Sequence, residues 1–356
     1  MLTCGAFGLI LIAPMTMDAD NAKTTRPLLE WLLRVFPDTP KTRAKQWIAA
    51  GRVSVNGQII RLPHQQLPDP QGTLKLLHRE TTALECKVNG WRIHPRVALL
   101  HLDAALAVVD KGAGLISVPA ENVDLSALSI VADFLAGNLR AMECGADGRG
   151  RSLPPAYRRL KPLPVHRLDQ YTTGVLCTAM NPTARRLLID QLKAHTMQRA
   201  YVAFVEGRPP AAKGTWKNWL KLRDDELRQF VIGDEEAQVA GEAAVEAITH
   251  YEVLAEFPLA NGRDVVSKLR FKLETGRKHQ IRAQAAFAGL PLIGDQTYNR
   301  RYREAEGAVH IDFPRQALHA ETLTLIHPGT GAQMTWAAPL PKDMRQLEGL
   351  LRAKRV

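Results

Sequence analysis

The chain has 356 residues, of which 46% are hydrophobic and 23% are charged, an ordinary composition for a globular protein with one large domain or two unequal ones. Its formal net charge of +11 indicates a polyanionic partner, because Lys and Arg release counterions from phosphates, although anionic membranes attract the same residues. The four cysteines are scattered without a CxxC pair, which argues against a disulfide or zinc framework and favours free thiols in a reducing compartment: Cys4, Cys86, Cys144 and Cys177.

The chain opens on an apolar run, LTCGAFGLILIAPMTM, over residues 2–17. The run is too short to span a bilayer, and no basic region precedes it, so a signal peptide has little support. Met15 and Met17 stand just before a polar stretch, so a misassigned start codon explains the run at least as well. We treat residues 1–24 as a separate segment.

Residues 25–78 show the pattern of a small domain. The stretch RPLLEWLLRVFP predicts a helix whose apolar face is formed by Leu28, Leu29, Leu32, Leu33 and Phe36. A second helix, KTRAKQWIAAGR, is predicted before VSVNGQII, where the Asn-Gly pair indicates a hairpin. A turn and a last strand follow in LPDPQGTLKLL.

This order of helix, basic helix and hairpin resembles the small RNA-binding domain typified by ribosomal protein S-four. The second helix and its end carry basic residues beside the hairpin, a surface suited to phosphate contacts. An alternative is a solvated basic helix in an unrelated domain. The residues expected to contact RNA here are Lys41, Arg43, Lys45 and Arg52.

From residue 95 the chain alternates strands and helices. LLHLDAALAVVDK predicts two strands around a turn, and a helix capped by Asp124 is expected to bury Leu128, Val131 and Leu135 and to end at Gly137. Residues 138–164, rich in Gly, Pro and Arg, predict a long basic loop. A strand and a helix capped by Asn181 follow the motif that comes next.

That motif is HRLDQYTTG, residues 166–174. It resembles the HRLDxxTSG signature of the RluA, RluC and RluD family of pseudouridine synthases. Three later segments resemble the same family in the same order: QRAYVAFVEGRP at 198–209, LETGRKHQIRAQAAFAGLPLIGDQTYN at 273–299, and ALHAETLTLIHPGTGAQMTWAAPLP at 317–341. Four segments spanning about half of the chain make chance a poor explanation.

The sequence departs from the family pattern at a few positions. Thr173 replaces a usual Ser, Arg199 a usual Lys, and Gln284 a common His. The early KPxG motif reads Lys111-Gly112-Ala113-Gly114, without the proline. None of these changes removes a group that performs chemistry, but together they indicate a divergent branch.

The resemblance implies that Asp169 is the catalytic carboxylate, acting either as a nucleophile on the ribose or as a base in a glycal route. It implies that Arg282 pairs with Asp169 and that Tyr201 stacks on the detached uracil. Arg167 is expected to contact the phosphate of the flipped nucleotide or to fill the space that the nucleotide leaves, and His166 to touch RNA or to orient the loop. The isomerisation gains no atoms, so no cofactor or metal is expected.

The fold implied is α+β: a pseudouridine synthase domain over 95–350 with a mixed, mainly antiparallel central sheet, joined by a linker over 79–94 to the small amino-terminal α/β domain. The substrate implied is large-subunit ribosomal RNA, with transfer RNA as an alternative. We expect a cytoplasmic monomer without a membrane partner; no protein partner can be inferred.

Two other functions compete with this one. A non-catalytic RNA-binding or ribosome-assembly protein could lose its carboxylate, yet Asp169, Tyr201 and Arg282 are all present. A methyltransferase would need a glycine-rich cofactor loop after its first strand, and Lys111-Gly112-Ala113-Gly114 is too short and poorly placed for one.

Overall fold

The computed structural model describes residues 25–49, 53–56, 58–60, 62–69, 74–76, 90–142, 153, 155–222, 228–299 and 311–353. The chain divides into two compact units, residues 1–83 and 84–356. The apolar segment 1–24, Arg52 and three of the cysteines (Cys4, Cys86 and Cys144) lie outside the described residues. In the part of the chain that is described, no helix is long and apolar enough to cross a membrane.

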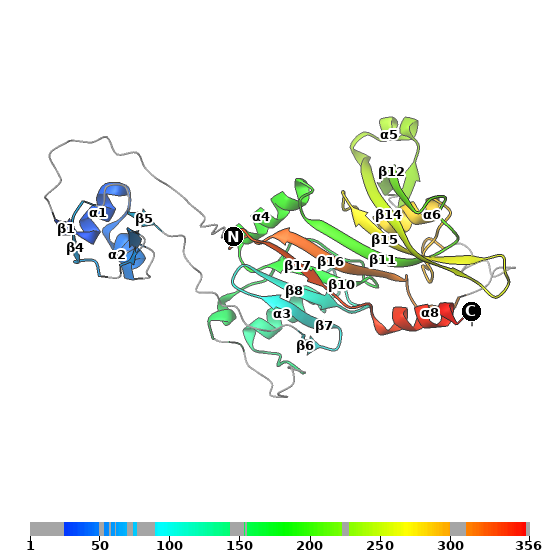
Figure 1. Cartoon of the computed structure of the whole chain (residues 1–356), viewed down its shortest axis with the longest axis horizontal. Helices are drawn as coiled ribbons and strands as arrows, with labels where there is room; N and C mark the ends of the chain where they lie inside the picture. The colour runs from blue at the N-terminus through cyan, green and yellow to red at the C-terminus, as the bar shows by residue number, and fades with distance from the viewer. Residues whose placement is uncertain are drawn as a thin grey trace, which may run out of the picture. The chain divides into compact units, whose positions relative to one another are not determined.

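The described part of the first unit contains two short helices and two small sheets (Figure 1). Its hairpin is confirmed: Val55 pairs with Gln58, and Asn56 adopts the left-handed conformation that such a turn requires. The elements are β1 (Arg26–Pro27), α1 (Leu28–Val35), α2 (Lys41–Ala49), β2 (Val53–Val55), β3 (Gln58–Ile59), β4 (Gln66–Leu67) and β5 (Lys75–Leu76).

The buried face of α1 differs from the predicted one. Trp31, which the predicted face does not include, is 2% exposed, and its ring N–H donates to the carbonyl oxygen of Leu67. Leu29 and Leu33 pack only at the edge of this core. A buried tryptophan needs a partner for its N–H, and only the folded chain brings β4 close enough to supply one.

The described residues of the second unit form one 12-stranded sheet, whose main path runs β13-β12-β14-β15-β11-β16-β10-β8-β7-β6. All described neighbours are antiparallel except β10 and β16, so the expected mixed, mainly antiparallel sheet is confirmed. The strands are β6 (Trp91–His94), β7 (Val97–Leu102), β8 (Leu106–Lys111), β9 (Leu163–Pro164), β10 (Thr173–Ala179), β11 (Gln198–Glu206), β12 (Lys213–Leu222), β13 (Gln229–Ile232), β14 (Ala244–Pro258), β15 (Val265–Leu273), β16 (Leu318–Ile326) and β17 (Gln333–Ala337).

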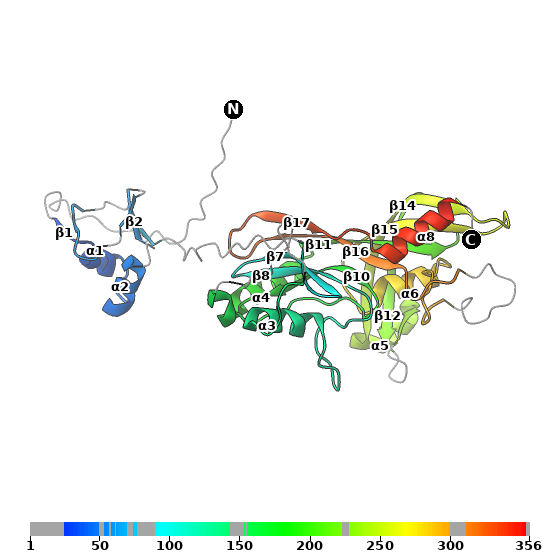
Figure 2. The same cartoon turned by 90° about the horizontal axis from the view of Figure 1, so that it is seen from below.

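Helices cover both faces of this sheet. Residues of α3 and α6 share one core with the inward side chains of β8, β10 and β11, whereas α4 and α8 pack against the opposite face. Figure 2 shows α8 on one side of the sheet and α3 on the other. The helices are α3 (Ala127–Ala136), α4 (Pro182–Lys193), α5 (Asp234–Ala240), α6 (Gln280–Phe287) and α8 (Lys342–Arg352), with 3-10 turns at Pro155–Arg159 and Gly241–Ala243.

Three local expectations need correction. The N-cap of α3 is Ser126, in a capping box with Ser129, rather than Asp124, and the helix buries Ile130 and Phe134 where Leu128 was expected. The supposed loop 138–164 contains the 3-10 turn and β9, and the described residues Tyr157 and Leu160 pack in or against the core. The expected linker 79–94 overlaps β6, which pairs with β7 at the end of the sheet.

The two strands β10 and β16 meet only where the signature motif ends. Their parallel pairing joins Thr173 to His319 and Gly174 to Ala320. Gly174 has a φ of 112°, and a Cβ atom on it would collide with the backbone of Ala320, so the close packing expected of this glycine is confirmed. This junction holds the preceding loop at the middle of the sheet.

Candidate active site

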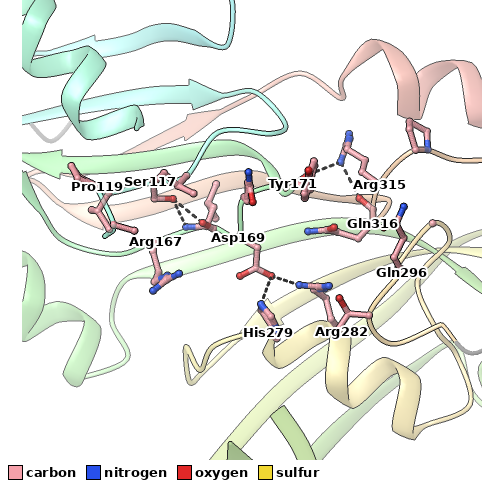
Figure 3. A pocket seen from close by; sticks show the side chains of 18 residues that line it. Ser117, Pro119, Arg167, Asp169, Tyr171, His279, Arg282, Gln296, Arg315 and Gln316 are labelled. Carbon is pink, nitrogen blue, oxygen red and sulfur yellow. Dashed lines mark hydrogen bonds and ion pairs between the residues drawn. The ribbon is translucent and has the colours of Figure 1, made fainter. Parts of the chain in front are cut away.

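The HRLD residues form the loop between β9 and β10, and Asp169 lies on the wall of a cavity of about 420 Å³. The cavity is bordered by the loop itself, by residues 116–120, by the start of α6 and by residues 294–297 and 314–316. Figure 3 shows the Asp169 carboxylate directed at His279 and Arg282. The side chain of Asp169 is 18% exposed, so solvent and substrate can reach it.

Arg282 connects this carboxylate to a second, buried one. Its Nη1 donates to Asp169 Oδ2 at 3.1 Å, while Nε and Nη2 donate to the two oxygens of Asp295 at 2.7 and 2.8 Å. Burial lowers the pKa of Arg282, but the hydrogen bonds and charge of Asp295, together with Asp169, raise it above its ordinary value. Arg282 is therefore a fixed cation beside Asp169.

Only one oxygen of Asp169 is held in this way. Arg282 and His279 both face Oδ2, at 3.1 and 3.8 Å. Among the residues that the structure describes, Oδ1 accepts no hydrogen bond. The carboxylate thus has one anchored oxygen and one that is available to a reacting atom.

The loop around Asp169 is held through its backbone. Ser117 Oγ both donates to the carbonyl of Leu168 and accepts its N–H, each at 2.8 Å. On the other side of Asp169, Lys111 Nζ donates to the carbonyl of Gln170 at 3.0 Å and Arg315 Nη1 to that of Tyr171 at 3.1 Å. Bonds to three of the four residues from 168 to 171 limit how far Asp169 can move.

Both anchoring side chains, Lys111 and Arg315, are removed from solvent. Lys111 is fully buried, and burial, partly offset by the charge of Asp169, lowers its pKa to about 7. Arg315 is neutralised by Asp343 at the start of α8, with separations of 2.7 and 3.0 Å. Figure 3 shows Arg315 directed at Tyr171.

Of the residues predicted to contact RNA, some are exposed and one points into the fold. Arg167 is exposed and lines the cavity. His166 instead points into the fold: its Nε2 accepts the backbone N–H of Cys177 at 3.1 Å, and burial lowers its pKa to about 3. These contacts favour the alternative in which His166 orients the loop. Lys41, Arg43 and Lys45 are exposed on α2 of the first unit.

Tyr201 lies on β11 and is 6% exposed. It belongs to the same core as Leu168 and Ile281, and its hydroxyl has a pKa raised chiefly by burial, with a further contribution from Asp169. The cavity around Asp169 is not lined by Tyr201. Its contact with a uracil base therefore stays a prediction.

Sequence reasoning missed several of these groups. Asp295 belongs to the GDxxY segment, but the sequence motif by itself assigns it no role. Lys111 is noticeable in the sequence only because the usual proline after it is missing. His279 occupies a fixed position of the TGRxHQIR motif, but the motif gives it no role, and Arg315 lies just before the last family segment. Gln284 stands where the family commonly has His. It is fully buried and accepts a hydrogen bond from Thr249, so we interpret it as a structural residue.

One group of side chains in the described part of the chain has the spacing of a metal site. The ligand atoms of His101, Asp103 and His327 lie within 4.8 Å of one another. However, Nδ1 of His327 accepts the N–H groups of Gly329 and Thr330, so its hydrogen is on Nε2 and points to Asp103. The internal hydrogen bonds occupy the atoms that a metal would need, and we interpret the cluster as structural.

Comparison with known proteins agrees with this geometry. Residues 105–287 match the family model for RNA pseudouridylate synthase. The chain belongs to the RNA pseudouridine synthase family. Residues 26–69 match the S4 domain model, so both resemblances drawn from the sequence motifs are confirmed.

Two curated relatives carry the name ribosomal large subunit pseudouridine synthase D. The protein from Escherichia coli K12 is 30% identical over 350 residues, covering 95% of this chain and 94% of its own. The protein from Pseudomonas aeruginosa is 32% identical over 333 residues, covering 90% and 91%. The solved structure of human RNA pseudouridylate synthase domain containing 4 has the same fold, with a TM-score of 0.51, 21% identity, and coverage of 71% of this chain and 92% of that one.

Proposed function

We propose that this enzyme converts uridines of large-subunit ribosomal RNA to pseudouridine and that Asp169 is its catalytic carboxylate. The observation that carries the assignment is the state of Asp169 at the cavity wall: Oδ2 is held by Arg282, while Oδ1 accepts no hydrogen bond from the described residues. The ribosomal substrate is proposed because the relatives that match nearly the whole chain bear that name.

The proposed chemistry needs a carboxylate that acts on the ribose and a group that holds the detached uracil. Asp169 would either attack the sugar carbon of the glycosidic bond or remove the neighbouring ribose proton. In both routes Arg282 holds one oxygen of Asp169 through a charge-assisted hydrogen bond. Tyr201 would support the uracil while it turns, and Arg167 at the cavity rim would contact the extruded nucleotide or its phosphate.

The deciding experiment maps pseudouridines in ribosomal RNA by carbodiimide modification and primer extension. It compares a strain that lacks the gene with strains rescued by the wild type or by Asp169→Asn. We expect at least one site in large-subunit RNA to disappear and to return only with the wild type. A site restored by Asp169→Asn would reject the catalytic assignment. A change confined to transfer RNA would move the substrate there, and no change in either RNA would favour a non-catalytic RNA-binding protein.

We further propose that residues 25–78 form a separate RNA-binding domain and that the enzyme acts as a cytoplasmic monomer. Lys41 and Lys45 are one helical turn apart and exposed, so they can face the same phosphates. Arg43 is a poorer test residue because its guanidinium lies 5.9 Å from the Trp47 ring and contributes to packing.

The domain proposal predicts a change in salt dependence. Replacing Lys41 and Lys45 together by Ala should flatten the slope of log K against log salt by about 0.7 to 0.9 for each phosphate that the variant no longer neutralises. The matched control replaces two exposed basic residues of α8, Lys342 and Arg345, by Ala. The measurement is filter binding of ribosomal RNA at several salt concentrations; equal slopes for both variants would reject the role of α2.

A further inference from the structure

His279 stands beside the catalytic loop in an unusual backbone conformation. It precedes α6 with a φ of 54°, in the left-handed region that His and Asn adopt more readily than most residues. Its ring lines the cavity, and Nε2 lies 3.8 Å from Asp169 Oδ2. In Figure 3 His279 and Arg282 approach the carboxylate from the same side.

Tyr298 determines which ring nitrogen of His279 carries the hydrogen. The Tyr298 hydroxyl oxygen accepts the N–H of Gln229 at 2.9 Å and lies 3.1 Å from His279 Nδ1. The arrangement that gives every hydrogen an acceptor has the phenol donating to Nδ1. The ring hydrogen of His279 is then on Nε2, where it faces Asp169.

Both partners of this contact are neutral at physiological pH. Burial raises the pKa of Tyr298 to about 12, which keeps its donor hydrogen. Burial lowers the pKa of His279 to about 4, against the opposing charge of Asp169. The pair therefore brings an oriented dipole to the carboxylate without adding a second full charge next to Arg282.

We propose that His279 is a positioning residue for the isomerisation: held by Tyr298 as the Nε2–H tautomer, it directs that hydrogen at Asp169 Oδ2 and, with Arg282, keeps Oδ1 turned toward the substrate. This inference rests on the proposed role of Asp169. The separation of 3.8 Å is longer than a hydrogen bond, and we expect it to shorten when RNA fills the cavity.

The chain offers variants that separate this role from packing. Tyr298→Phe removes the hydroxyl but keeps the ring. The centre of this ring lies 5.8 Å from that of the His279 ring, which it meets edge-on, and 5.1 Å from the Arg282 guanidinium. His279→Asn keeps a residue suited to the left-handed backbone and shortens the side chain. His279→Gln restores an N–H donor of similar reach.

The experiment measures tritium release from 5-tritiated uridine in a large-subunit ribosomal RNA transcript. We expect His279→Asn to lower kcat about 30-fold and Tyr298→Phe about 10-fold, with KM within about twofold, since the interaction acts on the reacting carboxylate. His279→Gln should recover much of the loss. ¹⁵N spectra of histidine-labelled enzyme should show His279 as the Nε2–H tautomer in the wild type and as a mixture in Tyr298→Phe.

Asp169→Asn in the same assay separates the two possible failures. If it is inactive while His279→Asn and Tyr298→Phe keep the wild-type kcat, the positioning role is wrong and the proposed function stands. If it is as active as the wild type, the proposed catalytic residue is wrong, and the inference fails with it. An Nδ1–H tautomer in the wild type, or a raised KM with unchanged kcat, would also overturn the role of His279.

Discussion

Two aspartates of this enzyme are almost equally exposed, at 18% for Asp169 and 16% for Asp103, and each has histidine neighbours. Oδ1 of Asp103 accepts two backbone N–H groups, and Oδ2 accepts His101 and His327. In Asp169, by contrast, one oxygen has no such partner among the described residues. Exposure alone therefore does not distinguish the two carboxylates; they differ in whether both oxygens are already hydrogen-bonded.

The largest effect should come from removing the charge of Asp169. We expect Asp169→Asn to lower kcat by at least about 10³-fold, while RNA affinity stays within about threefold and stability within about 1 kcal/mol. Single-turnover kinetics, filter binding and urea unfolding would measure the three quantities. A parallel loss of RNA binding and stability would show that Asp169 is structural, and the contrast with Asp103 would disappear.

Asp103, whose two carboxylate oxygens both accept hydrogen bonds, should behave in the opposite way. In Asp103→Asn the side-chain amide would place a donor against the Nε2–H of His327, whose Nδ1 is already committed to backbone N–H groups. We expect a loss of about 1 to 3 kcal/mol in the free energy of unfolding, with kcat within about threefold of the wild type. A fall in kcat without a fall in stability would contradict this assignment.

A smaller effect should appear at acid pH. Burial raises the pKa of Asp103, but hydrogen bonds from His101, His327 and the N–H of Leu106 bring the net value well below its ordinary 3.8. The unfolded chain therefore takes up this proton first as pH falls, so the stabilisation is complete above about pH 4 to 5 and is lost below it.

Urea unfolding between pH 7 and pH 3 would test that window. The stability difference between wild type and Asp103→Asn should be constant at neutral pH and should shrink below pH 4. Glu235→Gln, on the exposed part of α5, is the matched control. A difference that grows on acidification would show that Asp103 is not the stabilised group.

Much of the local structure follows from short-range patterns. The hairpin at Asn56, the cap at Asn181 and the close packing at Gly174 were all predictable, because each depends on backbone geometry within a few residues or on the absence of a side chain. Ser126 was missed as a cap because two oxygen-bearing residues stood near the same helix start. The choice between them depended on where the helix meets the core.

The sequence by itself determined the family and the fold class and predicted Asp169 and Arg282 as site residues, since their motifs are contiguous. Only the tertiary structure decided how these groups act on one another. Asp169 and Arg282 are 113 residues apart, and the anchors Lys111 and Arg315 come from still other segments. Ion pairs and tautomers depend on short distances between such segments, which the order of strands in the sheet sets and local sequence does not encode.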